Sequence, residues 1–258
     1  MHRVRIAAIT VFSALLLPFG AAASQMTWAA SGGSGNTWDI GEFTNSYLVD
    51  GVTVTITVTD NGPVSLIPGI DPKGSPGSLS SNSFLDPTGN AGGSNLFFKT
   101  RGNNDGINIL IEFDAVVENI SISMFDVDAT NSSGNGSYID LISGQSSLDQ
   151  ILWLDPDNVT GSASATWIWD GNSTVTGTDN ADETGGNSAD GTVNWEFTAP
   201  LSSINFDFSN ANSAFVTQWI GLSHINFTEG PEPGTAFLLG LGLFGVGLQG
   251  RQRRKRAR

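Results

Sequence analysis

Hydrophobic and polar residues alternate along much of this chain, in short bursts separated by glycine, serine and asparagine. The clearest burst, VTVTITVT, places four apolar residues on one face and four threonines on the other: Val52, Val54, Ile56 and Val58, then Thr53, Thr55, Thr57 and Thr59. The same period of two recurs in INILIEFDA (107–115), VNWEF (193–197) and SINFDF (203–208). This period indicates half-buried strands, and strands with one polar face are typical of antiparallel sheets.

Ten or more such bursts with turn residues between them, and no long amphipathic helix, predict an all-β fold. We expect an antiparallel β-sandwich, jelly-roll-like, over residues 24–230, a usual length for one domain of this class. The stretches 60–95 and 171–191 are rich in glycine and polar residues and are expected to be loops, the first with up to two short strands. The threonine row is expected to be the polar face of an outer strand, because an ice-binding plane would need matching rows on neighbouring strands.

The N-terminal end differs from this body in composition. Arg3 and Arg5 precede an apolar run over 6–22, and small residues occupy 21–23. That order is typical of a secretory signal peptide, so we expect residues 1–23 to export the body and to be removed by signal peptidase. The alternative is a permanent N-terminal anchor, which the small residues disfavour.

The C-terminal end carries a second apolar run. Residues 234–250 have no charge, and as a helix they would extend about 25 Å against a hydrocarbon core of roughly 30 Å. Six of the eight residues in 251–258 are basic, which holds that end in the cytoplasm. We therefore expect a single transmembrane helix over 234–250, a basic tail over 251–258, and the body outside the cytoplasmic membrane.

The order of features in 231–258 is more specific than a tail anchor. Pro231, Glu232 and Pro233 are followed by a short apolar run and a terminal arginine cluster. This segment resembles the PEP-CTERM sorting signal of Gram-negative bacteria, also catalogued as the ice-binding protein C-terminal domain. The resemblance implies that an exosortase recognises the tripeptide and removes the tail, and that the protein then reaches the cell surface or the extracellular matrix. Gly234 and Thr235 depart from the serine or alanine that is commoner after the motif.

Charge is distributed unevenly. Residues 24–230 hold three basic residues, Lys73, Lys99 and Arg101, against 24 acidic ones, a net charge of −21. Nucleic acid is excluded as a partner, because phosphate binding needs clustered lysine and arginine. Cations or uncharged sugars fit this surface better, and the simplest alternative is that the charge only keeps the protein soluble.

The chain has no cysteine, which excludes thiol chemistry and zinc–thiolate sites. One histidine, His224, lies in the body, within IGLSHINF. A Ser-His-Asp catalyst would have to use it. Its alternation with Ile225 and Phe227 predicts instead a histidine on the surface of a strand.

The stretch MFDVDATNSSGNGSYID (124–140) is a candidate calcium site. The apolar alternation slips at Met124 and Phe125, which predicts a bulge or a strand end. Asp126 and Asp128 would then point the same way, with Asn131 and Asp140 able to complete a shell of oxygen ligands such as Ca²⁺ prefers. The F-D-V-D and Y-I-D pattern also resembles, loosely, a strand-loop-strand unit of exported bacterial sandwich domains. The alternative is that the two aspartates cap a turn by accepting backbone N–H groups.

Tryptophan is frequent, and Trp167 and Trp169 share one face in TWIWD. Exposed aromatic rings in such a pair can stack against sugars. The alternative is that both pack into the core and Ile168 alone faces outward.

These features predict an exported, non-catalytic surface or matrix protein that is associated with exopolysaccharide and biofilm, as the resemblance implies. The alternative is a polysaccharide-active enzyme, a glycoside hydrolase or lyase, or a carbohydrate-binding module. Glycosidases need two carboxyl groups about 5–9.5 Å apart. A deep cleft that holds one carboxyl in an apolar setting would favour the enzyme.

Overall fold

The computed structural model describes residues 23–28, 36, 38, 43–60, 67–68, 96–101, 106–130, 138–148, 152–161, 165–179, 191–211 and 217–230. Within these ranges the chain forms strands and no helix, so none of them holds a helix able to cross a membrane. The predicted signal peptide, Ala23 excepted, and the predicted sorting signal lie outside the described residues. The strands are β1 Ala23–Met26, β2 Thr44–Val49, β3 Val52–Asp60, β4 Ile67–Pro68, β5 Leu96–Arg101, β6 Gly106–Phe125, β7 Ala129–Thr130, β8 Tyr138–Leu148, β9 Leu152–Leu154, β10 Asn158–Thr160, β11 Trp167–Trp169, β12 Thr174–Gly177, β13 Val193–Phe197, β14 Leu201–Ala211 and β15 Thr217–Glu229.

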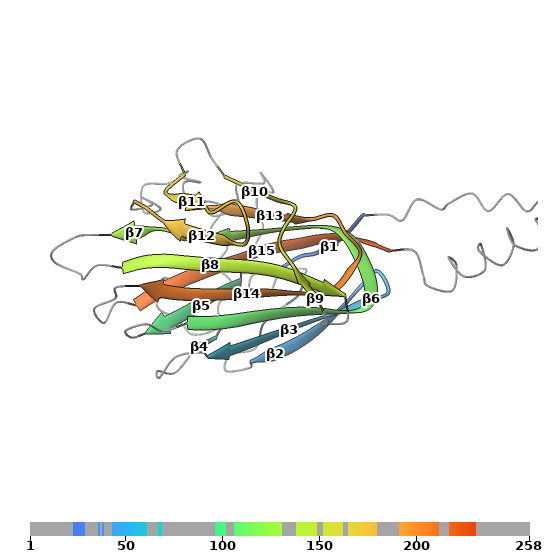
Figure 1. Ribbon diagram of the computed structural model, residues 1–258. Helices are drawn as coiled ribbons and strands as arrows, with labels where there is room; N and C mark the ends of the chain where they lie inside the picture. Colours follow the sequence, from blue (N-terminus) through green and yellow to red (C-terminus); the bar gives the residue numbers. More distant parts are fainter. Residues whose placement is uncertain are drawn as a thin grey trace, which may run out of the picture.

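The long strand β6 organises the fold, because it belongs to both layers (Figure 1). Its first half pairs with β3 up to Phe113 and with β14 up to Glu112, and its second half pairs with β15 from Val117 and with β13 from Ile120 onward. Between these halves, at 114–116, the strand bends and the sheet curls back on itself. β14 reaches past the bend, since its Leu201 pairs with Val117. One layer therefore runs β11-β12-β8-β14-β6-β3-β2. The other runs β10-β13-β6-β15, and the outer edge of β15 is shared by β5 and β1.

Aromatic side chains from the two layers meet in the core. Trp195 of β13 and Phe206 of β14 pack edge to face with ring centroids 5.4 Å apart. Phe113 and Phe227 make a second such contact at 5.4 Å. All four rings are buried, so two sheets that share β6 close over one apolar core. The predicted all-β antiparallel sandwich is confirmed, since every pairing between strands is antiparallel.

The alternation predicted in β3 is also confirmed. Its four apolar side chains are at most 1% exposed, while Thr53, Thr55 and Thr57 are partly exposed. The hydroxyls of this row bond to the neighbouring strand β2: Thr44 Oγ1 lies 3.3 Å from Thr57 Oγ1, and Ser46 Oγ lies 2.8 Å from Thr55 Oγ1. The threonines are thus the polar outer face of the sheet, as expected.

The prediction that 171–191 is a loop is wrong for its first part, because Thr174–Gly177 forms β12 between β11 and β8. Val175 is fully buried and fixes this short strand. The turn before it depends on Asp170, whose Oδ1 accepts the N–H groups of Asn172 at 2.8 Å and Thr174 at 3.0 Å. Burial alone would raise the pKa of this carboxyl, but the backbone donors outweigh it and hold the pKa below its ordinary value.

Candidate functional site

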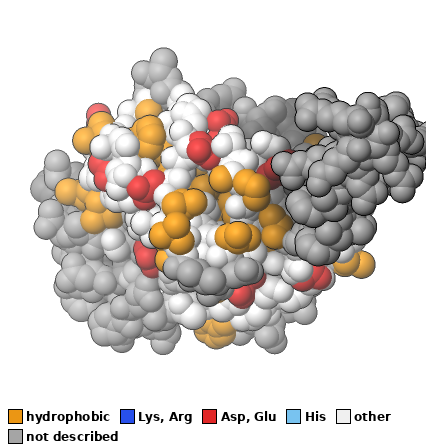
Figure 2. Space-filling model, turned by 45° about the vertical axis from the view of Figure 1, so that its right-hand side comes forward, with side chains coloured by type: hydrophobic (Ala, Val, Ile, Leu, Met, Phe, Trp, Pro, Cys, Tyr) orange, Lys and Arg blue, Asp and Glu red, His pale blue; other side chains and the backbone are white. Residues whose placement is uncertain are grey.

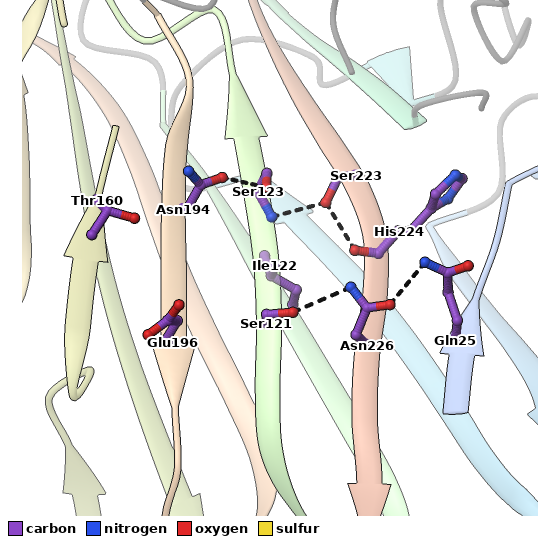
Figure 3. Close-up of a pocket in the computed structure, with 10 residues that line it drawn as sticks. All are labelled: Gln25, Ser121, Ile122, Ser123, Thr160, Asn194, Glu196, Ser223, His224 and Asn226. Carbon is purple, nitrogen blue, oxygen red and sulfur yellow. Dashed lines mark hydrogen bonds between the residues drawn. The ribbon is translucent and has the colours of Figure 1, made fainter. Parts of the chain in front are cut away.

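A polar groove crosses five adjacent strands of the second layer, in the order β10, β13, β6, β15 and β1 (Figure 3). Its volume is about 250 Å³. The residues that line it are all polar except one isoleucine: Gln25, Ser121, Ile122, Ser123, Thr160, Asn194, Glu196, Ser223, His224 and Asn226. Ligand pockets usually exceed about 300 Å³, so this groove suits a small ligand or a short stretch of a polymer.

Period-two alternation explains how these polar residues reach one face. On β13, Val193, Trp195 and Phe197 are buried in the core, so Asn194 and Glu196 between them point outward. On β6, Ser121 and Ser123 lie in the same way opposite Glu196 and Asn194. The sequence of each strand thus supplies the polar face, and strand pairing brings the faces together.

A bulge in β15 places Ser223 and His224. Leu222 pairs with Met124 and Ile225 pairs with Ile122, so two residues of β15 face the single residue Ser123. Ser223 Oγ bridges the bulge, since it accepts the Ser123 N–H at 2.8 Å and donates to the His224 carbonyl at 2.8 Å. The local break in pairing therefore remains hydrogen-bonded.

The prediction of a surface histidine is wrong, because His224 is only 7% exposed although it lines the groove. The segment after β1 covers it. The Trp28 backbone N–H donates to His224 Nδ1 at 3.3 Å, and the Trp28 indole donates to the Ser223 carbonyl at 2.9 Å. Because Nδ1 accepts this hydrogen bond, the ring is in the neutral form that carries its proton on Nε2. His224 thus links β15 to the segment that follows β1.

Two rows of hydrogen bonds fix the groove surface (Figure 3). In one row, Gln25 Nε2 donates to Asn226 Oδ1 at 2.8 Å, and Asn226 Nδ2 donates to Ser121 Oγ at 3.2 Å. In the other, Ser123 Oγ donates to Asn194 Oδ1 at 2.6 Å. These bonds hold the amide side chains in set orientations, so a ligand would meet a surface that is already ordered.

Glu196 is the one carboxylate among the lining residues, and it is exposed. Its Oε2 accepts a bond from Asn158 Nδ2 at 3.1 Å across the β10–β13 pair. Among the described lining residues there is no lysine or arginine, and His224 supplies the one ring. The groove can therefore donate and accept hydrogen bonds and attract a positive charge, but it repels anions.

The predicted calcium ligands are arranged differently from the expectation. β6 ends at Phe125, which confirms the predicted strand end, and Asp126 adopts a left-handed backbone with φ 67°. Asp126 and Asp128 thus do not lie side by side on an extended strand. Asp128 and Asp140 do come together: the Asp128 N–H donates to Asp140 Oδ2 at 3.2 Å, and both residues are buried. Asn131 lies outside the described residues. Among those that are described, no group of three or more acidic, histidine or cysteine side chains is arranged to hold a metal.

The predicted sugar-stacking pair faces inward. Trp167 is 8% exposed, and its indole N–H donates to the Thr192 carbonyl at 2.9 Å. Trp169 is partly buried against the core, while Ile168 between them is 61% exposed. Trp167 therefore offers no open face to a sugar ring, and the alternative of core packing describes β11 better.

The groove residues themselves were not singled out from the sequence. Asn194 and Glu196 could have been assigned to an outward face from VNWEF alone. What the sequence does not show is that β13 neighbours β6, and that β1 neighbours β15 some two hundred residues later. The spacing of three between Leu222 and Ile225 was the available signal for the bulge.

Residues 231–254 match the family model described as the PEP-CTERM protein-sorting motif. This match confirms the motif predicted at Pro231, Glu232 and Pro233. The chain is thus a β-sandwich protein with a sorting signal, and the motif implies that it is exported and sorted as an exosortase substrate. No curated protein matches the chain in sequence.

Solved structures give low similarity. One is the module CBM32-3 from a family 31 glycoside hydrolase of Clostridium perfringens, with 12% identity, TM-score 0.27, and coverage of 53% of this chain and 76% of that one. A second belongs to the carbohydrate-binding modules of the β-sandwich superfamily, with 12% identity, TM-score 0.33, and coverage of 69% and 57%. A third is the family 11 carbohydrate-binding module of Clostridium thermocellum, with 9% identity, TM-score 0.26, and coverage of 82% and 99%. Similarity at this level does not identify a ligand.

Proposed function

We propose that this chain is an exported, non-catalytic protein of the cell surface or extracellular matrix, which an exosortase sorts and cleaves, and whose polar groove binds an uncharged exopolysaccharide. The observation that carries the proposal is the groove itself. It presents amide and hydroxyl groups from five strands, which suit the many hydroxyl groups of a sugar chain. An association with biofilm follows if the polymer is part of the matrix.

The chemistry of the groove supports a binding role over catalysis. Hydrolysis of a glycosidic bond needs a pair of carboxyl groups, and Glu196 is the one carboxylate among the described lining residues. It is exposed, whereas the enzyme alternative calls for a carboxyl held in an apolar setting within a deep cleft. Glu196 therefore serves as a hydrogen-bond acceptor for hydroxyl groups.

Charge narrows the class of polymer. The body carries a net charge of −21, and Glu196 lies in the groove. Polymers of uronic acids or sulfated sugars would be repelled, whereas neutral sugars would not. Each hydrogen bond adds only about 0.5–1.5 kcal/mol net, so one site binds weakly and a polymer is retained through repeated contacts.

Affinity electrophoresis of the exported body tests this proposal. In gels that contain a soluble neutral glucan we expect the body to be retarded, and in gels that contain a polyuronate we expect no retardation. Glu196→Gln replaces a charge-assisted acceptor by a neutral one, a loss of about 1 kcal/mol or roughly fivefold in affinity for the glucan. The same variant is expected to lose part of its discrimination against polyuronate.

Glu112→Gln is the matched control, since it removes the same charge from β6 outside the groove. Thermal unfolding of both variants checks that the fold is unchanged. Equal retardation of Glu196→Gln and wild type would contradict a role for the groove. Release of shortened or unsaturated sugars from the glucan would show that the protein is an enzyme after all.

A further inference from the structure

The end of the sandwich where β6 bends lies on the right of Figure 1, and exposed leucines belong to the strands that reach it. Leu148 and Leu152, 48% and 63% exposed, face each other across the β8–β9 pair, and Leu48, 75% exposed, lies just before the β2–β3 turn. We call this the basal end, defined by Leu48, Leu148, Leu152 and the bend at 114–116. Figure 2 turns this side of the molecule toward the viewer and shows apolar side chains gathered there.

Strand register places these leucines at the level of the bend. Ser147, next to Leu148, pairs with Ser203 of β14, and Leu201 of the same strand pairs with Val117 just after the bend. On the other side of the layer, the Thr53 N–H donates to Asp114 Oδ1 at 2.7 Å, and Thr53 pairs with Leu48. Four strand spacings of about 4.8 Å separate Leu148 on β8 from Leu48 on β2, roughly 19 Å, and Leu152 on β9 lies one spacing further. This spread suits a flat surface better than a single peptide.

The ends of the described body lie at the same place. Ala23 pairs with Thr228, and Glu229 pairs with Val117. The Gly230 N–H donates to the Val116 carbonyl at 2.8 Å, which fixes the last described residue to the bend. The predicted transmembrane helix begins at 234, four residue steps later. Four steps reach at most about 14 Å.

We propose that the basal end rests on a lipid surface of zwitterionic headgroups while the C-terminal helix is still attached. A tether of about 14 Å keeps this end near the bilayer, and the leucines supply apolar contacts to it. The acidic residues Asp50, Asp114, Glu118 and Glu229 lie at the same end, so anionic headgroups are disfavoured. The proposal rests on the predicted helix and on the sorting part of the proposed function, and it is independent of the groove.

Single-cysteine labelling of the full-length chain tests the contact, because the natural chain has no cysteine. Leu152→Cys carries an environment-sensitive dye at the basal end. Ile168→Cys is the matched control, since Ile168 is 61% exposed, close to the value for Leu152, and lies toward the opposite end of the sandwich. The strand register through β12, β8 and β14 places it level with the first residue of β6. In phosphatidylcholine vesicles, we expect the dye at 152 to shift its emission to the blue and to be quenched by nitroxide lipids. The dye at 168 is expected to do neither.

Equal quenching at both positions would overturn the proposal, as would a chain that does not insert through 234–250. If the blue shift at 152 occurs only in vesicles that also contain the exosortase, the contact is with protein and the lipid proposal fails. Replacing Leu48 and Leu148 by serine is expected to reduce quenching at 152 and to leave glucan retardation unchanged. If the chain does not bind glucan but the dye at 152 is still quenched, the groove proposal fails and the proposed lipid contact stands.

Discussion

At the β2–β3 turn, two consecutive residues adopt left-handed backbone, Asp50 with φ 50° and Gly51 with φ 95°. This is the Asp-Gly pattern of a two-residue hairpin turn. A Cβ on Gly51 would meet no atom within 4 Å, so the conformation alone requires glycine there. Gly51→Ala is expected to lower the free energy of unfolding by about 1 kcal/mol, which a melting curve records as a fall of roughly 2–4 °C. Asp50→Asn is the control that should melt like wild type, since asparagine accepts this φ.

Two buried tryptophans allow a comparison of hydrogen bonds. The indole N–H of Trp167 donates to the Thr192 carbonyl, whereas that of Trp195 is buried without a partner in the described structure. Trp167→Phe leaves a buried acceptor unsatisfied, while Trp195→Phe removes a donor whose burial already costs about 1–3 kcal/mol. We expect Trp167→Phe to be the more destabilising by about 1–2 kcal/mol in urea unfolding. The opposite order would mean that packing of the larger ring decides.

At the scale of elements, the connection from β6 through β7 to β8 keeps the calcium prediction open to test. Asp128 and Asp140 are both buried, and the Asp140 carboxylate accepts the Asp128 N–H, so these residues are in contact at a place where a cation would offset their negative charge. If Ca²⁺ binds, it stabilises the fold by about 2.7 kcal/mol at 100 times its Kd, a rise of several degrees in melting temperature relative to chelator. The double variant Asp126→Asn, Asp128→Asn should lose that rise.

Sodium at matched ionic strength is the control for this experiment, because a body of net charge −21 gains stability from screening alone. An equal rise in melting temperature in sodium, or a full calcium response in the double variant, would contradict the calcium site. The carboxylates would then serve only as caps that accept backbone N–H groups in the turn. The hydrogen bond from the Asp128 N–H to Asp140 Oδ2 already shows one such cap.

The sequence predicted best those elements whose burial is regular. β3 is buried on one face throughout, so its alternation alone predicts which side chains enter the core and which form the polar outer face. The sequence separates the burst 107–115 from the alternation that slips at Met124, because the bend between them interrupts the apolar pattern. Only the pairing shows that β6 is one strand that serves two layers. On β15, the predicted surface position of His224 is wrong, because its cover by Trp28 depends on a contact 196 residues distant in the sequence.

At the scale of the whole molecule, the groove and the basal end are products of topology. The groove collects residues from near 25, 121, 160, 194 and 224, and no local pattern indicates that these strands are neighbours. The sorting motif, by contrast, is contiguous, and its tripeptide, apolar run and arginines were readable directly. Local signals thus gave the sorting motif, while the candidate binding surface required the three-dimensional arrangement.

The pairing of β1 with β15 has a consequence for the order of events during export. β1 is the first described strand in the chain and β15 the last, so their bonds join residues about two hundred positions apart. The second half of β6 likewise waits for β13 and β15. Contacts of such long range form late, because chain closure must come first. In a chain exported from its N-terminus, as the sorting motif implies, the sandwich would therefore close only after nearly all of the body had crossed the membrane. Completion of the fold and arrival of the sorting signal at the membrane would then fall close together in time.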